Sequence, residues 1–413
     1  MTKTYKTLLL LNSLTIYRGI LDRGVIKSYM DLLSGINLPP EDFLSAYGSF
    51  YKLLTERDIT DNLARYITEA ALFDENSFSI SAAGGKADEL SETVLESVKK
   101  DCETIYNIAQ LCAEDIINDY KYSSDIEDIT ASLPRWKTGE PVDEFKNGAD
   151  INKLIAFYKN NGFGIYARYK AFIWRDGGIK PVGHPDKIAV SSFIGYERQR
   201  NRVIENTKAF LDGKTCNNCL LYGDMGTGKS STVKAIGNEF RNKGLRIVEM
   251  PKERLMEFPL LIEKIAANPM KFIIFVDDLS FQHQDKNYTS LKAVLEGGLA
   301  AKPDNALIYA TSNRRHLIKE SWADRDTDDI NRRDNMQETL SLSDRFGLSV
   351  YYGNPDKKEY LEIVHSLAEK AGLDIETDEL SLLAERFALG KGGRSPRCAK
   401  QFIESFGKSG GKL

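Results

Sequence analysis

The sequence predicts an α/β fold in which a core with a parallel sheet follows a mostly helical domain and precedes a small helical one. Two features of the 413 residues support this prediction. From residue 190 onward, β and α patterns alternate as they do in α/β sheets. In residues 1–130, and again from residue 355, apolar side chains recur at the period of an α-helix.

Composition and charge indicate the broad class of protein but not its partners. Apolar residues make up 42% of the chain and charged residues 28%, as in an ordinary soluble globular protein. The net charge of −4 is too small to indicate a partner. Acidic side chains outnumber basic ones in residues 1–186, which argues against general nucleic-acid binding by that region.

The N-terminal segment MTKTYKTLLLLNSL resembles the start of a signal peptide. However, Asn12 and Arg18 interrupt the apolar run and no A-x-A cleavage site follows, so an amphipathic helix is the better interpretation. The five cysteines are scattered and odd in number, which is typical of a reducing compartment. No apolar run approaches the length of a membrane span. We therefore expect a cytoplasmic protein that is not bound to a membrane.

We expect the first domain to span residues 1–186 and to include a short β-hairpin near residues 164–182. The hairpin is predicted because GIYARYKAFIW alternates apolar and polar residues and is followed by the turn RDGG. Prolines and glycines then indicate a linker. The α/β core is expected in residues 187–354 and the small helical domain in residues 355–413.

The core has five candidate strands, each an apolar run bounded by polar or turn-forming residues. These runs are residues 219–223, 245–250, 272–278, 306–312 and 348–353. Because helical patterns separate them, we expect the strands to lie in a parallel sheet.

The first of these strands leads into GDMGTGKS, which matches the phosphate-loop pattern G-x-x-x-x-G-K-[ST] in full. Glycines at these positions let backbone N–H groups converge on phosphate oxygens where a helix begins. Lys229 is expected to reach the β and γ phosphates, and the Ser230 hydroxyl to ligate Mg²⁺. The residues of this loop that we expect to bind nucleotide are Gly223, Gly226, Thr227, Gly228, Lys229, Ser230 and Ser231. A GTPase is not favoured, because the sequence has no base-reading motif of the N-K-x-D type.

Two further strands end in polar side chains that suit a nucleotide site. The run FIIFV is followed by Asp277, which is expected to hold Mg²⁺, and by Asp278, which stands where a water-activating carboxylate is needed. The run LIYAT leads to Ser312 and Asn313, and we expect one of them, preferably Asn313, to orient the attacking water. A glutamate is more usual than Asp278 at its position, and the aspartate has a reach about 1.5 Å shorter.

Taken in order, FIGYE, GTGKSS, FVDDLSF, ATSNRRHL, LSDRFG and GGRSPR resemble the motifs of the AAA+ ATPases. More narrowly, they are similar to a group of that class described only as ATP-binding proteins of unknown function. The resemblance covers about residues 190–407 and says almost nothing about residues 1–185. It implies a P-loop core with a C-terminal helical lid, ATP and Mg²⁺ as cofactors, ATP hydrolysis, and a ring or spiral of identical subunits.

The resemblance also implies roles for residues at both ends of the site. Phe193, Ile194 and Gly195 correspond to the segment that lines the adenine pocket of AAA+ proteins. In the lid, Arg397 corresponds to sensor 2, the arginine that contacts phosphate, and Arg394 is the alternative for that role.

The same resemblance assigns residues near the γ-phosphate. Asn313 corresponds to sensor 1, and Arg345 corresponds to the arginine finger that reaches the nucleotide of a neighbouring subunit. Arg314 and Arg315 are further candidates for a contact across that boundary. Residues 321–340, which are charge-dense and aperiodic, are expected to form an insertion before Arg345.

Three functions are compatible with the sequence. The favoured one is an ATPase that remodels a protein partner bound by the N-terminal domain. Its hydrolysis is expected to be slow, because misplacing a catalytic group such as Asp278 by about 1 Å can cost on the order of 10²-fold. The second is an initiator- or loader-type ATPase acting on nucleic acid, although no dense run of Lys and Arg is present. The third is a nucleotide-bound switch with little hydrolysis.

A protein unfoldase usually presents an exposed aromatic side chain in a pore loop. Met256 and Phe258 follow the second core strand without the glycine expected beside them, and Phe281 follows the aspartate pair. Packing is the more usual role for such residues, so the sequence does not favour an unfoldase over other remodellers.

Overall fold

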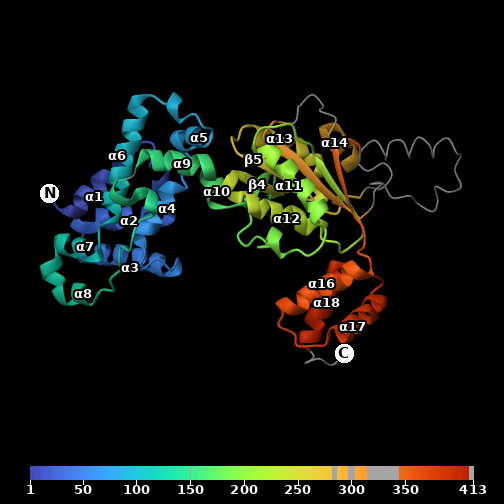
Figure 1. Cartoon of the computed structure of the whole chain (residues 1–413). Helices are drawn as coiled ribbons and strands as arrows, with labels where there is room; N and C mark the ends of the chain where they lie inside the picture. Colours follow the sequence, from blue (N-terminus) through green and yellow to red (C-terminus); the bar gives the residue numbers. More distant parts are fainter. Residues whose placement is uncertain (149, 281–285, 296–302, 314–343, 409–413) are drawn as a thin grey trace. The chain divides into compact units, whose positions relative to one another are not determined.

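The computed structural model describes residues 1–148, 150–280, 286–295, 303–313 and 344–408. The chain divides into two compact units, Met1–Arg168 and Tyr169–Leu413 (Figure 1). The division therefore falls inside the range predicted for the β-hairpin, just before its observed strands, and not near residue 186, where the sequence had placed the boundary.

The first unit is built of helices, as its apolar periodicity predicts. Its α-helices are α1 (Lys3–Asn12), α2 (Gly24–Ser34), α3 (Pro40–Glu56), α4 (Leu63–Leu72), α5 (Ser77–Ala83), α6 (Glu92–Ala109), α7 (Ala113–Asp119), α8 (Glu127–Ser132), α9 (Ile151–Asn161) and α10 (Gly164–Arg168). In α3, the side chains of Phe43, Tyr47, Phe50 and Leu54 recur every three or four residues and are all buried. Apolar faces on other helices, such as α2, α4 and α6, pack with this one and give the unit its own core.

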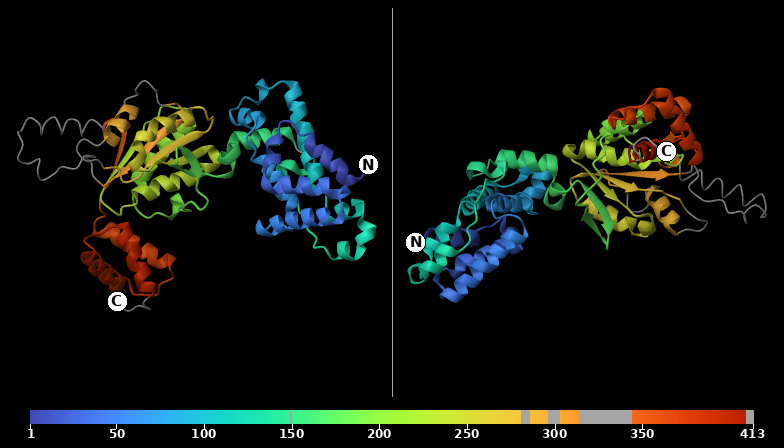
Figure 2. Two further views of the ribbon diagram at one scale, coloured as in Figure 1. Left: turned by 180° about the vertical axis from the view of Figure 1, so that it is seen from behind. Right: turned by 90° about the horizontal axis from the view of Figure 1, so that it is seen from below.

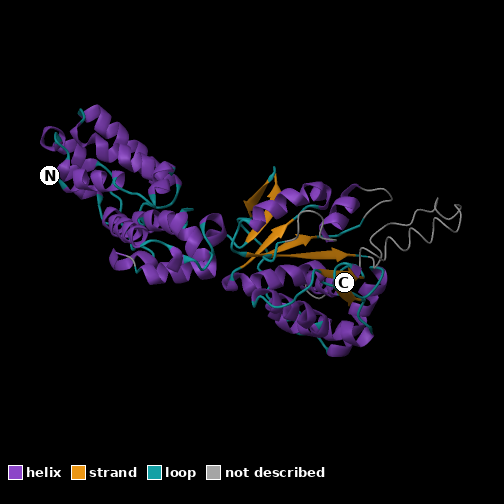
Figure 3. Cartoon of the chain, turned by 90° about the horizontal axis from the view of Figure 1, so that it is seen from above, coloured by secondary structure: helices purple, strands orange, loops and turns teal. Residues whose placement is uncertain are grey.

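The second unit is built on a seven-stranded sheet with the order β2-β1-β4-β5-β6-β3-β7 (Figures 2 and 3). Its strands are β1 (Ala171–Arg175), β2 (Gly178–Pro181), β3 (Cys219–Gly223), β4 (Leu245–Glu249), β5 (Lys271–Val276), β6 (Ala306–Ser312) and β7 (Leu348–Tyr352). All neighbouring strands are parallel except β1 and β2. The five predicted core strands are all present, and the predicted parallel-sheet P-loop fold is confirmed.

Helices cover both faces of this sheet (Figure 3). They are α11 (Glu197–Leu211), α12 (Lys229–Phe240), α13 (Phe258–Ala266) and α14 (Lys286–Leu295). Val203 and Phe210 of α11 and Val233 and Phe240 of α12 share an apolar cluster with strand residues such as Leu221. Figure 2 shows α13 and α14 on the opposite face. The sheet is therefore the buried middle layer, and the carboxyl ends of its parallel strands meet at one edge.

The last three helices, α16 (Lys357–Lys370), α17 (Thr377–Gly390) and α18 (Pro396–Lys408), lie in the range for which the sequence predicts a small helical domain. They enclose an apolar cluster of their own, which includes Tyr360, Ala384 and Phe402. A capping box fixes the start of α16, because the Asp356 side chain accepts a hydrogen bond from the Glu359 N–H (2.8 Å) and the Glu359 side chain accepts one from the Asp356 N–H (3.1 Å).

The β-hairpin extends the core sheet. β1 pairs in parallel with β4, with Phe172 opposite Val248. Phe172 and Trp174 alternate onto the buried side of β1, and the Trp174 Nε1 donates a hydrogen bond to Glu257 Oε2 (2.6 Å). This burial against the core explains why the hairpin belongs to the second unit. The first residues of the predicted strand form α10 instead.

Candidate nucleotide site

The phosphate loop connects β3 to α12 and depends on three glycines. Gly223, Gly226 and Gly228 have φ values of +132°, +79° and +92°, a region that side chains other than hydrogen rarely permit. At Gly223 a Cβ atom would lie 2.1 Å from the carbonyl oxygen of Tyr352 on the neighbouring strand β7. The loop then enters α12 at Lys229, and the N-terminus of a helix favours an anion.

Lys229 is only 6% exposed and lies against the loop. Its Nζ donates hydrogen bonds to the carbonyl oxygens of Gly223 (3.0 Å) and Asp224 (2.6 Å). Burial lowers the pKa of Lys229, and the carboxylates of Asp224 and Asp278 act in the opposite direction. The loop therefore holds an amine beside its own backbone, where an anion would supply the missing counter-charge.

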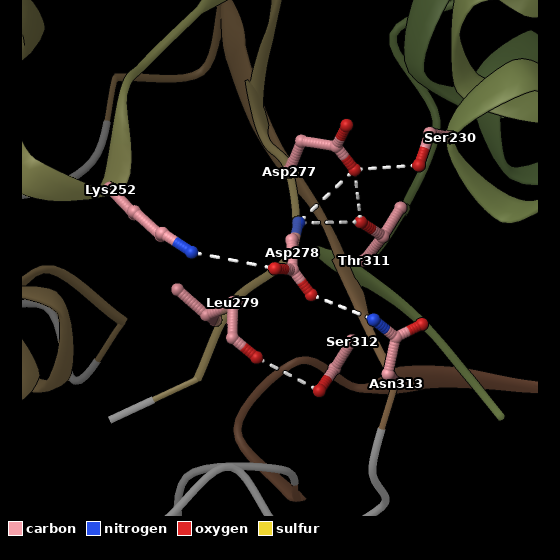
Figure 4. A network of polar contacts seen from close by, with 8 residues as sticks. All are labelled: Ser230, Lys252, Asp277, Asp278, Leu279, Thr311, Ser312 and Asn313. Atoms are coloured by element: carbon pink, nitrogen blue, oxygen red, sulfur yellow. Dashed lines mark hydrogen bonds and ion pairs between the residues drawn. The ribbon is translucent and has the colours of Figure 1, made fainter. Parts of the chain in front are cut away.

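Asp277 brings β5, β6 and α12 together (Figure 4). Its Oδ1 accepts hydrogen bonds from the Ser230 hydroxyl (2.6 Å) and from the Thr311 hydroxyl. A carboxylate beside a serine hydroxyl is a set of hard oxygen donors, so these residues fit a Mg²⁺ ion. Thr311 was not predicted from the sequence, but alternation along β6 places its side chain on the same face as that of Asn313.

Asp278 lies next to this pair with both carboxylate oxygens engaged (Figure 4). Oδ1 accepts a hydrogen bond from Asn313 Nδ2 (2.8 Å), and Oδ2 lies 3.4 Å from Lys252 Nζ. Ser312, the alternative to Asn313, is buried and donates to the carbonyl oxygen of Leu279 (2.8 Å). The structure therefore brings Asn313, and not Ser312, to the aspartate pair.

Aromatic and apolar side chains form the other end of the site. Phe193 and Ile194 line it, together with Tyr196, Tyr352 and a buried arginine, Arg200. The Tyr196 ring stacks on the Tyr352 ring, with centroids 5.4 Å apart. This surface offers flat apolar contact of the kind that a nucleobase requires.

The lid contributes Arg397 to the site. The backbone N–H of Arg397 donates to the carbonyl oxygen of Gly226 in the phosphate loop (3.1 Å), and its side chain lines the cavity. Arg394 instead forms a bidentate ion pair with Glu385 inside the lid, at 2.8 and 2.7 Å. Of the two arginines considered from the sequence, the structure places Arg397 at the site.

These groups surround one cavity of about 840 Å³. The predicted residues that line it are Phe193, Ile194, Gly226, Thr227, Gly228, Lys229, Ser230, Ser231, Asp277, Asp278, Asn313 and Arg397. Three predicted residues do not line it: Gly195, Gly223 and Arg345. Gly195 and Gly223 are backbone positions next to lining residues, whereas Arg345 precedes β7.

The remaining sequence hypotheses are placed as follows. Met256 is 60% exposed on η8 (Lys252–Glu257), a 3-10 helix after β4, whereas Phe258 is buried. Arg314, Arg315, Phe281 and residues 321–340 lie outside the described residues.

The sequence did not predict that Lys252 and Arg200 belong to the site. Neither belongs to a motif, and each reaches the site only because the chain folds back onto it. Lys252 follows β4, the neighbour of β5 in the sheet, and Arg200 lies on the first turn of α11.

The strand order, the phosphate loop and the polar residues at the strand ends define a P-loop α/β fold. The family model described as "Protein of unknown function (DUF815)" matches residues 167–409. The chain belongs to this family. The matched region begins close to the division between the two units.

Solved structures with a similar core include two named proteins. The RuvB Holliday junction branch migration motor of Thermotoga maritima is 16% identical, with a TM-score of 0.37, and the match covers 53% of this chain and 63% of that one. The AMPPCP-bound DnaA of Aquifex aeolicus is 19% identical, with a TM-score of 0.38, and the match covers 55% and 66%. The chain thus spans less than two thirds of these proteins. No curated protein matches in sequence.

None of the helices in the described part of the chain combines the length and the apolarity that a membrane crossing requires.

Proposed function

We propose that this protein binds ATP with Mg²⁺ and hydrolyses it slowly. The observation that carries the proposal is the meeting of Ser230, Asp277, Asp278 and Asn313 beside a complete phosphate loop in one cavity. These side chains supply the hydroxyl, carboxylates and amide that phosphoryl transfer to water requires. The aromatic end of the cavity is suited to the base.

Each polar group then has one task. Lys229 exchanges its two carbonyl partners for phosphate oxygens. Ser230 and Asp277 hold the metal, which when bound neutralises charge on the phosphates. Asp278 accepts a proton from the attacking water, and Asn313 orients it. Arg397 contacts phosphate from the lid.

Slow turnover follows from the state of Asp278. Its reach is about 1.5 Å shorter than that of a glutamate. In addition, Asn313 and Lys252 already occupy both of its oxygens. These same contacts support the second candidate, a nucleotide-bound switch with little hydrolysis.

We further propose that the working form is a ring or spiral of identical subunits in the cytoplasm. Arg345 does not line the cavity of its own chain, which suits an arginine finger that acts on a neighbour. The helical unit Met1–Arg168 is then the part that binds a protein to be remodelled.

The test is to measure ATP binding and phosphate release by the full chain, alone and with single-stranded or duplex DNA. The variant Asp278→Asn is expected to bind ATP as the wild type does but to release no phosphate. Lys229→Ala is expected to lose binding. Absence of ATP binding by the wild type would refute the proposal, binding without turnover would select the switch, and stimulation by DNA would select the initiator-type alternative.

A further inference from the structure

A buried arginine supports the aromatic end of the cavity. Arg200 is 6% exposed, and arginine is rarely buried without partners. Its guanidinium donates hydrogen bonds to the carbonyl oxygen of Gly195 and to Glu197 Oε1 (3.3 Å). It also lies 5.3 Å from the centroid of the Phe193 ring. One side chain therefore holds both ends of the segment 193–195.

The other sides of this segment are held as well. The Phe193 ring lies close to the phosphate loop, since a Cβ atom on Gly228 would be 3.9 Å from Phe193 Cε1. Ile194 packs against the apolar cluster of the lid. Gly195 has φ of +74°, and a Cβ atom there would lie 3.8 Å from Ile363 Cδ1 on α16. The segment thus contacts the phosphate loop and the lid, and Arg200 of α11 contacts it from a third side.

We propose that Arg200 is a positioning residue that fixes Phe193 as the wall against which the nucleobase packs, and that it thereby sets the base selectivity of the site. This inference rests on the proposed ATP site. A guanidinium can donate hydrogen bonds in its plane while its charge lies over an aromatic ring, and a lysine cannot reproduce both contacts. Glu197 does not carry the effect, because its side chain is 69% exposed and an exposed ion pair contributes little.

The test compares the dissociation constants of ATP and UTP for the full chain by calorimetry. Both nucleotides carry the same triphosphate, so the ratio of the two constants reports on the base end of the cavity. The variants are Arg200→Met and Arg200→Lys, with Arg198→Met as the matched control at an exposed position of α11. Phe193→Leu is measured alone and together with Arg200→Lys.

The wild type and Arg198→Met are expected to prefer ATP over UTP by about tenfold or more, because a purine has the larger stacking face. In Arg200→Met the ratio is expected to fall to within about threefold, as a ring contact and a buried hydrogen bond are lost together. The ratio in Arg200→Lys should lie between those of the wild type and Arg200→Met. Adding it to Phe193→Leu should change the ratio little further, because the two residues act as one unit.

Several results would overturn the inference. They are a wild type without base preference, an unchanged ratio in both Arg200 variants, and an equal loss of affinity for both nucleotides, which would make Arg200 a merely structural residue. If Arg200→Met does not fold, Arg200→Lys and the double variant give the same comparison. A wild type that binds neither nucleotide would instead contradict the proposed function.

Discussion

Asp278 has a backbone conformation that is unusual for an aspartate. Its φ is +50°, in the left-handed region, and its N–H donates to Asp277 Oδ1 (3.1 Å) and to Thr311 Oγ1 (2.9 Å). Such a conformation costs on the order of 1–3 kcal/mol and persists where the surroundings over-determine it. The two hydrogen bonds supply that restraint, so the carboxylate is presented at the strand end in one orientation.

The ion pair of Lys252 with Asp278 leads to a prediction about rate. Both side chains are well exposed, and the interaction free energy of such an ion pair is at most about 1 kcal/mol. Lys252→Met is therefore expected to raise kcat of ATP hydrolysis by up to about fivefold, with little change in KM. Lys214→Met, which removes a similar exposed pair with Asp212, is the control. A fall in kcat on removing Lys252 would mean that the lysine assists the reaction.

The residues of the site differ in how well the sequence predicts them. Lys229, Ser230, Asp277 and Asn313 are predictable because they belong to motifs that follow three core strands, β3, β5 and β6, and the parallel sheet brings those strand ends together. Lys252 has no such local constraint. Its place is set by how the chain turns after β4, which depends on packing between distant segments.

At the scale of elements, η8 joins the β-hairpin to the strand ends. Lys252 at its start contacts Asp278, and Glu257 at its end accepts the hydrogen bond from Trp174 of β1. Arg254 between them lies 3.4 Å from Glu257 and 3.9 Å from Asp176 in the hairpin turn. A single 3-10 helix thus contacts both the edge of the sheet and the proposed catalytic carboxylate.

The Trp174–Glu257 hydrogen bond leads to a stability prediction. Trp174→Phe keeps most of the buried ring but removes the indole donor of a carboxylate that is partly exposed, at a cost of about 0.5–1.5 kcal/mol in the free energy of unfolding. We expect a lower melting temperature, measured by calorimetry. The double variant Trp174→Phe/Glu257→Leu should regain part of the loss, because it leaves no carboxylate without its indole donor, while Arg254, which also loses Glu257, is partly exposed and keeps Asp176 nearby. A double variant no more stable than Trp174→Phe would contradict this account.

Lys170, just before β1, leads to a prediction about pH. Burial, together with the nearby positive charges of Arg246 and Arg241, lowers the pKa of Lys170 to about 7, against 10.5 for an ordinary lysine. Between about pH 7 and pH 10.5 the folded state therefore binds fewer protons than the unfolded state. The free energy of unfolding consequently rises with pH across this range. Lys170→Met should raise the melting temperature relative to wild type most below pH 7, and this gain should shrink towards pH 10. If the substitution acted only through contacts that do not titrate, the difference in melting temperature between variant and wild type would be the same at every pH, which would contradict this account.

The positions of the core strands are predicted best from the sequence. The sheet that the β-hairpin joins is predicted worst. The run FIIFV can only be a buried strand in this context, because neighbours cover both of its faces. The alternation in AFIWR indicates a strand but carries no information about which sheet it joins. That choice depends on pairing with β4, which lies far along the sequence.

At the scale of the whole molecule, the proposed oligomer leads to a kinetic prediction. If Arg345 completes the site of a neighbour, the rate of ATP hydrolysis per subunit should rise with protein concentration and then level off. Arg345→Ala should lose the increase, by roughly 10³-fold or more at saturation. ATP affinity at low concentration should remain unchanged. A specific rate independent of concentration in the wild type would contradict the composite site.

The helical unit Met1–Arg168 was predicted only in outline. Periodicity gives its helices, but the sequence has no motif that fixes how they pack. Its core depends on aromatic pairs between segments far apart in the sequence, such as Phe43 with Tyr120 and Phe50 with Trp136. Contacts of this kind are set by the shapes of both partners, which a single sequence does not reveal.

The strand at one edge of the sheet also bears on whether copies of the chain can aggregate. The sheet begins with β2, a strand of four residues that ends in exposed Lys180 and Pro181. Proline has no N–H to donate, and a lysine opposes close approach of another strand. This edge is a poor template for a further strand, so two copies of the chain are not expected to pair edge to edge through β2.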